Sequence, residues 1–164
     1  MKNDDIVITS AFRTAIGTFR GSLKGMQAHD LGALTIEAVM QKSNLNPNDV
    51  DELIMGQVLT SATGQNPARQ AAILAKMPVE KTAYVINQVC GSGLRSVAAG
   101  YQAIMCNDSK IIIAGGQESM TNAPHAIYFR DGEKLDEAKL IDTMIKDGLW
   151  DAFNGYHMGV TAEN

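Results

Sequence analysis

The chain has 164 residues, of which 45% are hydrophobic and 20% charged, and this composition is typical of an ordinary folded protein of one domain or slightly more. The net charge of −4 argues against a nucleic-acid or anionic-membrane partner, because both require clustered basic residues. With only two cysteines, the chain also lacks the disulfide framework of a small secreted domain.

The first 59 residues predict two strands with a helix between them. Residues 6–8 are a short β-branched run, typical of a buried strand, and residues 11–29 are loop-like. Asp30 is predicted to cap a helix that ends at the break in residues 44–49. A second strand is expected over residues 53–59. The apolar positions of the helix follow helical spacing and are Leu31, Leu34, Ala38 and Val39.

The same alternation continues as far as residue 116. Asn66-Pro67 is a strong helix start, and that helix is expected to run to about Lys76. Residues 83–87 and 111–116 are predicted as strands. Between them lies a helical stripe that follows Cys90 and consists of Leu94, Val97, Ala98, Tyr101, Ile104 and Met105. Alternating strands and helices predict an α/β domain with parallel strands and covering helices.

From Gln117 onward the pattern changes to loop-rich sequence. One helix is expected between Leu140 and Leu149, and residues 161–164 resemble the opening of another. We therefore predict a domain over residues 1–117 and a separate subregion over residues 118–164. Because the second subregion looks unfinished, we expect the chain to be a truncated piece of a longer protein.

The sequence predicts neither a targeting segment nor a membrane span. The first ten residues contain two acids and only a short apolar run, unlike a signal or transit peptide. No stretch of about 18 apolar residues is present. A cytoplasmic location, where both cysteines stay reduced, is therefore expected.

Cys90 is the strongest candidate for a reactive residue. It lies between a predicted strand and an amphipathic helix, next to Gly91 and Gly93, which allow a tight turn and close approach. Ser92 can cap the helix. A thiol at a helix N-terminus is favoured as the nucleophilic thiolate, and the free N–H groups there can stabilise an oxyanion. The alternative interpretation is a small buried hydrophobe at a strand end, and the C-G-S-G spacing alone does not decide between the two.

Several segments resemble the thiolase family. Residues 87–95 (NQVCGSGLR) are similar to the nucleophile segment, and residues 114–120 (AGGQESM) resemble the second signature one strand later. Residues 141–164 look like the loop region of short-chain, biosynthetic thiolases, and residues 10–25 and 63–72 are also similar. The resemblance covers essentially the whole chain, in order. It implies the N-terminal half of a thiolase-like layered α/β fold, with a mostly parallel sheet and part of the loop domain.

The resemblance also implies an activity, that of an acetyl-CoA acetyltransferase. Cys90 would take an acetyl group from acetyl-CoA, and a second acetyl-CoA would attack it to form acetoacetyl-CoA; the reverse reaction is thiolysis. Coenzyme A thioesters serve as substrates, and no metal or other cofactor is expected. The family also uses a histidine and a second cysteine from its C-terminal half. Neither motif is within these 164 residues, so we expect this chain to be inactive alone.

Other residues receive weaker assignments. His157 and Met158 are similar to a pair that lines the acyl and pantetheine pocket in short-chain thiolases, although a hydrogen-bonded loop histidine and a packing methionine remain alternatives. His29 is predicted to lie at the surface. His125 is predicted to be structural. Cys106 is predicted to be inert core.

Two further residues complete the predictions. Glu118 follows the Gly-Gly end of a strand, and a structural hydrogen-bonding role is favoured over a catalytic one. Leu135 lies where tetrameric relatives present an apolar loop residue to a neighbouring subunit, which suggests a homotetramer. The alternatives to a thiolase are another condensing enzyme of the same fold, such as a ketoacyl synthase, and a thiolase-like protein that binds acyl groups or lipids without catalysis.

Overall fold

The computed structural model describes residues 5–130 and 139–164 and contains a three-stranded parallel sheet. The strands are β1 (Glu52–Gly56), β2 (Thr82–Ile86) and β3 (Ile112–Gly116), in the order β2-β1-β3. Glu52 pairs with Thr82 on one side and with Ile112 on the other, so all three strands begin and end at the same level. Their carboxyl ends therefore form one common edge.

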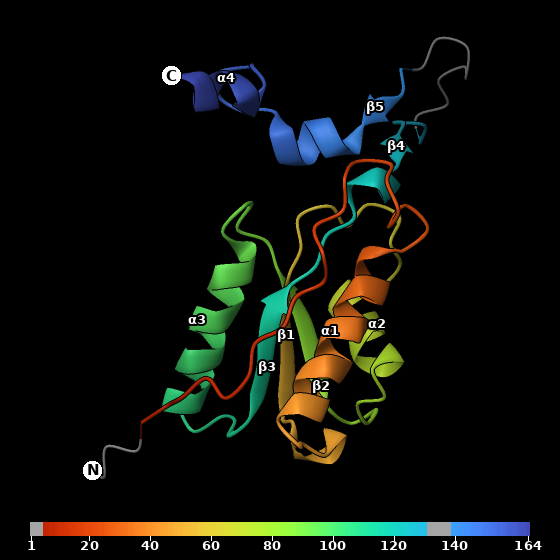
Figure 1. Cartoon of the computed structure of the whole chain (residues 1–164). Coiled ribbons are helices and arrows are strands. Elements are labelled where there is room, and N and C mark those ends of the chain that lie inside the picture. The colour runs from red at the N-terminus through yellow and green to blue at the C-terminus, as the bar shows by residue number, and fades with distance from the viewer. Residues whose placement is uncertain (1–4, 131–138) are drawn as a thin grey trace.

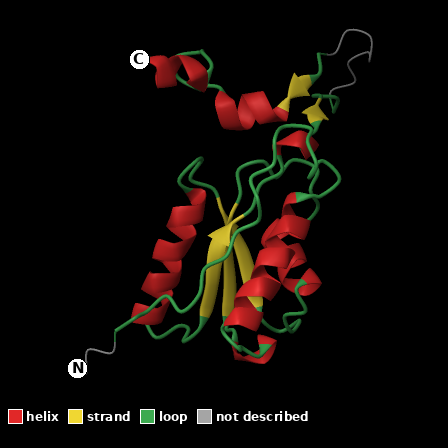
Figure 2. Cartoon of the chain, viewed as in Figure 1, coloured by secondary structure: helices red, strands yellow, loops and turns green. Residues whose placement is uncertain are grey.

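Helices cover both faces of the sheet (Figure 1, Figure 2). Helices α1 (Ala28–Lys42) and α2 (Pro67–Leu74) pack side by side on one face, and α3 (Ser92–Met105) packs on the other. The parallel order and the covering helices confirm the predicted α/β layers. No helix in the described ranges is both long and apolar enough to cross a membrane.

The main hydrophobic core lies between β1 and the α1–α2 pair. Leu53 and Met55 belong to it, whereas Ile54, which is also fully buried, points to the other face as strand alternation requires. The contribution of α1, α2 and the C-cap of α2 comes mainly from alanines, namely Ala33, Ala68, Ala71, Ala72 and Ala75, together with Ile36 and Met40. Alanines on α2 allow that helix to approach both α1 and the sheet closely.

Of the three helix caps predicted from sequence, one is correct and two are displaced along the chain. Asn66 is the N-cap of α2, and its side-chain oxygen accepts the N–H of Arg69 at 3.1 Å. For α1 the predicted cap was wrong by three residues. Gln27 is the N-cap, and the Asp30 carboxylate reaches back to accept the N–H of Gln27 at 2.9 Å. Likewise Gly91, not Ser92, is the N-cap of α3.

The buried strand predicted at residues 6–8 is absent. This segment is extended but exposed, with Val7 at 68% and Ile8 at 79% relative exposure. A strand needs a ladder partner, and no backbone hydrogen bond links residues 5–17 to another described element. High β-propensity alone did not produce a strand here.

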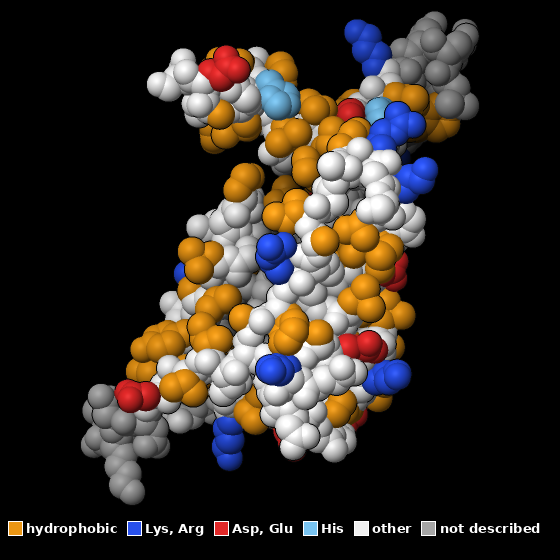
Figure 3. Space-filling model, viewed as in Figure 1, with side chains coloured by type: hydrophobic (Ala, Val, Ile, Leu, Met, Phe, Trp, Pro, Cys, Tyr) orange, Lys and Arg blue, Asp and Glu red, His pale blue; other side chains and the backbone are white. Residues whose placement is uncertain are grey.

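The predicted apolar stripe of α3 is also not the face that packs on the sheet. The buried residues of α3 are the small ones, Ser92, Ser96 and Gly100. The Ser96 hydroxyl donates to Gly115 O at 2.7 Å, which ties the helix to β3. Leu94 is 78% exposed, and apolar side chains gather over α3 on the left of Figure 3.

The segment after β3 lies beyond the carboxyl edge of the sheet (Figure 1). It contains the 3-10 turn η2 (Met120–Asn122), the antiparallel pair β4 (His125–Ala126) and β5 (Ile141–Asp142), the π-helical turn η3 (Met144–Leu149) and α4 (Met158–Glu163). The helix predicted from Leu140 is thus a short strand followed by a π-helical turn. Leu135 lies outside the described residues.

Candidate functional site

Cys90 lies in a tight turn between β2 and α3, as predicted. Val89, directly before it, has a positive φ of 47°, which is unusual for a β-branched residue. The Ser92 hydroxyl donates to Val89 O at 2.6 Å and accepts the N–H of Gln88 at 2.8 Å. The turn is therefore closed by side-chain as well as backbone hydrogen bonds.

Glycines allow the start of α3 to sit directly on the carboxyl edge of the sheet. A Cβ atom at Gly56 would lie only 2.4 Å from the carbonyl carbon of Ser92 and 2.5 Å from the nitrogen of Gly93. Gly93 and Gly116 also meet backbone to backbone, so α3 begins at the ends of β1 and β3. This is the edge at which parallel α/β sheets commonly bind ligands.

A cavity of about 430 Å³ opens beside the Cys90 turn. Its walls come from the ends of β1 and β3 with the residues that follow them, from the Cys90 turn with the start of α3, and from η3. Its larger apolar side chains are Val58, Leu59, Val89, Met120 and Leu149. The size is within the range of small-molecule sites, which are mostly apolar with a few polar groups. A larger cavity of about 560 Å³ lies along residues 6–14, but Cys90 does not line it.

The start of α3 offers hydrogen-bond donors next to the thiol. The N–H groups of Gly91 and Ser92 donate to Gln88 O and Val89 O. In the described parts of the chain, those of Gly93 and Leu94 have no hydrogen-bond acceptor, as is usual in the first turn of a helix. Such groups are suited to stabilise negative charge on a thiolate or on an acyl oxygen.

Glu118 has the hydrogen-bonding role that was favoured for it. Its carboxylate accepts the N–H of Val58 at 2.9 Å and that of Leu59 at 3.2 Å, and so fixes one wall of the cavity. Burial raises the pKa of Glu118 above its ordinary value, although the two backbone hydrogen bonds act in the opposite direction. The carboxylate is satisfied by backbone groups, which matches a structural role.

A pair of buried amides that was not predicted from sequence lies beside Glu118. The Gln117 side chain donates to Gln57 Oε1 at 2.8 Å, and Gln57 Nε2 donates to Leu59 O at 2.9 Å. Both glutamines are at least 93% buried and line the cavity. Gln117 belongs to the AGGQESM segment, but its partner lies 60 residues away, so local sequence carries no sign of the contact.

His157 and Met158 lie at the start of α4 and are not among the residues that line the Cys90 cavity. His157 is the N-cap of α4, and its Nδ1 accepts the N–H of Gly159 at 2.9 Å. Both side chains are exposed. Their role at the substrate therefore stays a prediction.

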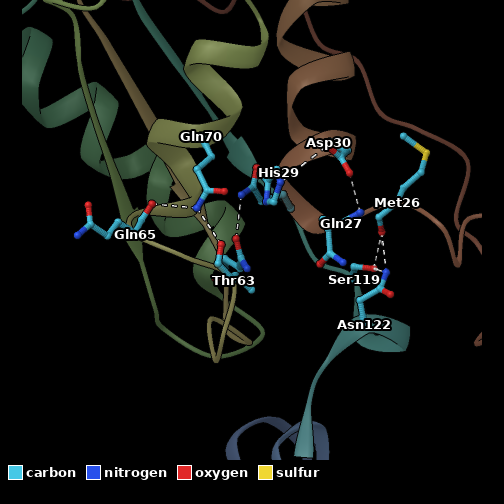
Figure 4. Close-up of polar contacts among 11 residues, drawn as sticks. Met26, Gln27, His29, Asp30, Thr63, Gln65, Gln70, Ser119 and Asn122 are labelled. Carbon is cyan, nitrogen blue, oxygen red and sulfur yellow. Dashed lines mark hydrogen bonds and ion pairs between the residues drawn. The ribbon is translucent and has the colours of Figure 1, made fainter.

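The other histidines lie away from Cys90. His29, predicted at the surface, is largely enclosed, with 18% of its side chain exposed and Nε2 at 3.8 Å from Asp30 Oδ1 (Figure 4). Nearby, Ser119 and Asn122 both donate to Met26 O, which ties the segment after β3 to the loop before α1 (Figure 4). His125 pairs with Asp142 at 3.9 Å across β4 and β5.

Cys106 is not the inert core residue that was predicted. It is the C-cap of α3, directly after the predicted apolar stripe, and it is exposed. Cys90 is exposed as well. The two thiols thus lie at opposite ends of one helix, and accessibility does not distinguish them.

Comparison with known proteins identifies relatives over nearly the whole chain. A family model described as "Thiolase, N-terminal domain" matches residues 6–164. The chain is 58% identical to an acetyl-CoA acetyltransferase of Paracoccus denitrificans, over 96% of its own length and 40% of the relative's. It is 57% identical to an acetyl-CoA acetyltransferase of Rhizobium meliloti, over 100% of its own length and 42% of the relative's. The crystal structure of Acat5 thiolase from Ascaris suum in complex with coenzyme A superimposes with a TM-score of 0.87 at 36% identity, covering 92% of this chain and 39% of that one.

Proposed function

Because this chain belongs to the thiolase family, we propose that the complete protein exchanges acetyl groups between coenzyme A thioesters. It condenses two acetyl-CoA to acetoacetyl-CoA and free CoA, or catalyses the reverse thiolysis. The observation that carries this proposal is Cys90, placed at the N-terminus of α3 beside a cavity of about 430 Å³. Curated relatives named acetyl-CoA acetyltransferase support acetyl as the transferred acyl group and coenzyme A as its carrier.

In the first half-reaction, the Cys90 thiolate attacks the carbonyl carbon of acetyl-CoA. The carbonyl oxygen becomes negatively charged, and the N–H groups of Gly93 and Leu94, which follow Cys90 in the first turn of α3, are the donors we assign to stabilise it. Collapse of the adduct breaks the bond to the CoA sulfur, which leaves and takes up a proton. Acetyl-Cys90 remains as a covalent intermediate.

In the second half-reaction, a second acetyl-CoA loses a proton from its methyl carbon. The resulting carbanion attacks acetyl-Cys90 and expels the Cys90 thiolate, which yields acetoacetyl-CoA. One thioester replaces another, and the carbon next to a thioester is acidic enough for a side-chain base, so we propose no metal and no separate cofactor. The chain spans about 40% of the length of its curated relatives. We assign the base and its partner to the family's histidine and second cysteine.

Several finer features belong to the same proposal. His157 and Met158 line the acyl and pantetheine end of the substrate when the site is fully assembled. The enzyme is a cytoplasmic homotetramer that serves fatty acid metabolism. Support for the pocket assignment is the similarity of residues 141–164 to the loop region of short-chain thiolases.

The decisive experiment follows the acetyl group. Incubating the complete protein with acetyl-CoA should add one acetyl group, located on Cys90 by peptide mass spectrometry. Cys90→Ala should abolish it, while Cys106→Ala, the matched control at the other end of α3, should leave it unchanged. Acetylation that persists in Cys90→Ala would show that another residue is the nucleophile, and no acetylation of the unmodified protein would exclude the proposed reaction.

A further inference from the structure

Val89 adopts a conformation that its side chain disfavours. Its φ of 47° is in the left-handed region, which β-branched residues rarely occupy, and it directly precedes Cys90. Such a conformation persists only where surrounding groups hold it. The direction in which the chain enters Cys90 depends on this one residue.

Two side chains hold Val89 from its two ends. Ser92 holds the carbonyl: its hydroxyl and its N–H both donate to Val89 O, at 2.6 and 3.0 Å. Asn87 holds the amide: its Oδ1 accepts the N–H of Val89 at 2.9 Å. Without Asn87, the peptide plane between Gln88 and Val89 loses the acceptor that this geometry provides and is free to rotate toward negative φ.

The same Asn87 side chain also contacts Val58, which lines the cavity. Its Nδ2 donates to Val58 O over a long 3.5 Å, and the N–H of Val58 is held by Glu118. The amide thus lies between the Cys90 turn and the wall that Glu118 fixes. Of its two contacts, the 2.9 Å bond to Val89 is the stronger.

We propose that Asn87 is a positioning residue for Cys90: by accepting the N–H of Val89, it holds Val89 in the left-handed conformation that aims the thiol at the cavity. Its catalytic significance rests on the proposed acetyl transfer. Its effect on the thiol does not, because the geometry around Cys90 exists without substrate. Asn87 does not touch the reacting atoms and acts through Val89 alone.

The test uses the two cysteines as reporter and reference. Iodoacetamide labelling of the full chain, quantified separately at each site, gives the ratio of the Cys90 rate to the Cys106 rate. Asn87→Ala should lower this ratio about tenfold, because a small displacement of a reacting group has a large effect on its rate. Asn48→Ala, in the 3-10 turn Pro47–Asp49 (η1), is the control and should leave the ratio unchanged. In the acetyl-transfer assay, Asn87→Ala should lower kcat with little change in KM.

The Val89→Gly variant tests whether Asn87→Ala changes the labelling ratio through the conformation of Val89. Glycine adopts positive φ readily, so Asn87→Ala should change the ratio much less in a Val89→Gly background than in the unmodified chain. An unchanged ratio in Asn87→Ala, or an equally large loss in the Val89→Gly background, would overturn the proposal. The comparison within the glycine background also decides the case if the single variant folds poorly. If the labelling results hold but no acetyl group is transferred, the proposed function fails and the positioning role stands.

Discussion

The carboxylate of Glu118 accepts the backbone N–H of Val58 at 2.9 Å across 60 residues of sequence. Through this bond and the one to Leu59, the end of β3 holds the end of β1 in the wall of the Cys90 cavity. Glu118→Ala should therefore lower the free energy of unfolding by about 1–3 kcal/mol, because two partly buried donors lose their acceptor. Denaturant titration measures the change. Glu118→Gln, which keeps one acceptor oxygen, should lose less, and equal losses in both variants would contradict this reason.

Two carboxyl groups should give opposite slopes of stability against pH. The backbone N–H groups of Lys110 and Ile111 lower the pKa of Asp51, so its stabilisation is present above its ordinary pKa of 3.8 and is lost as the pH falls through the lowered value. Burial raises the pKa of Glu118, so stability from this group is greatest below its ordinary pKa of 4.5 and decreases as the pH rises through the raised value. The free energy of unfolding can be measured from about pH 2 to about pH 7. Asp51→Asn should reduce the loss of stability toward acidic pH, and Glu118→Gln should reduce the loss of stability as the pH rises through the raised pKa of Glu118. The same slope in parent and variant would disprove the corresponding assignment.

Gly56 should tolerate no side chain. A Cβ there would meet the backbone of Ser92 and Gly93 at 2.4–2.5 Å, and backbone atoms cannot move aside as a flexible side chain can. Gly56→Ala should cost at least about 1–3 kcal/mol and displace the start of α3. Gly25→Ala is the matched control, since among the described residues no heavy atom other than those of its chain neighbours lies within 4 Å of its Cβ position. Thermal unfolding compares the two, and a Gly56→Ala protein as stable as the control would refute the close packing.

Cys90 should be alkylated by iodoacetamide at neutral pH well before Cys106. Both thiols are exposed, but Cys90 precedes the N-terminus of α3 and Cys106 is its C-cap, so only at Cys90 can the positive end of the helix dipole stabilise negative charge on the attacking sulfur. Time-resolved peptide mass spectrometry gives both rates in one sample. Faster labelling of Cys106 would argue against Cys90 as the activated nucleophile.

Two substitutions of His157 should separate its effect on KM from its effect on the stability of α4. His157→Ala removes the acceptor for the N–H of Gly159 as well as the imidazole, whereas His157→Asn retains a good N-cap. Both variants should raise KM for acetoacetyl-CoA in thiolysis, but only His157→Ala should also lower the Tm. If His157→Asn restores KM together with the Tm, the residue is a helix cap and no more.

Sequence predicted the features that depend on neighbouring residues. Asn66 and Pro67 marked the start of α2 because a capping oxygen and a preset φ act within one turn. The Cys90 turn was equally visible, since a strand, a Gly-rich turn and a helix follow one another there. Asp30 correctly indicated the start of α1, but it lies three residues after the N-cap Gln27 and is not the cap itself. An acidic residue can stabilise the first turn of a helix both at the N-cap and at the third helical position, so residue type does not distinguish the two.

Features that depend on distant partners were not predicted. Residues 6–8 have strand propensity but no ladder partner, and Cys106 follows an apolar stripe that faces away from the sheet. The hydrogen bond from the N–H of Val89 to Asn87 Oδ1 is local, but it was not predicted either, because residue type does not reveal the positive φ of Val89. Gln57 and Gln117 meet across 60 residues, and neither shows this contact in its local sequence.

By itself, the sequence determined the α/β class, the position of Cys90 at a helix start and the likeness to thiolases, because each resides in short patterns of residue type. Only the tertiary structure decided that α3 packs through Ser92, Ser96 and Gly100 rather than through its larger apolar residues. Close backbone approach at Gly56, Gly93 and Gly116 leaves room for small side chains alone on that face. The hydrophobicity of a side chain indicates whether burial is favourable for it. The distance between the backbones of α3 and the sheet decides which side chains fit between them.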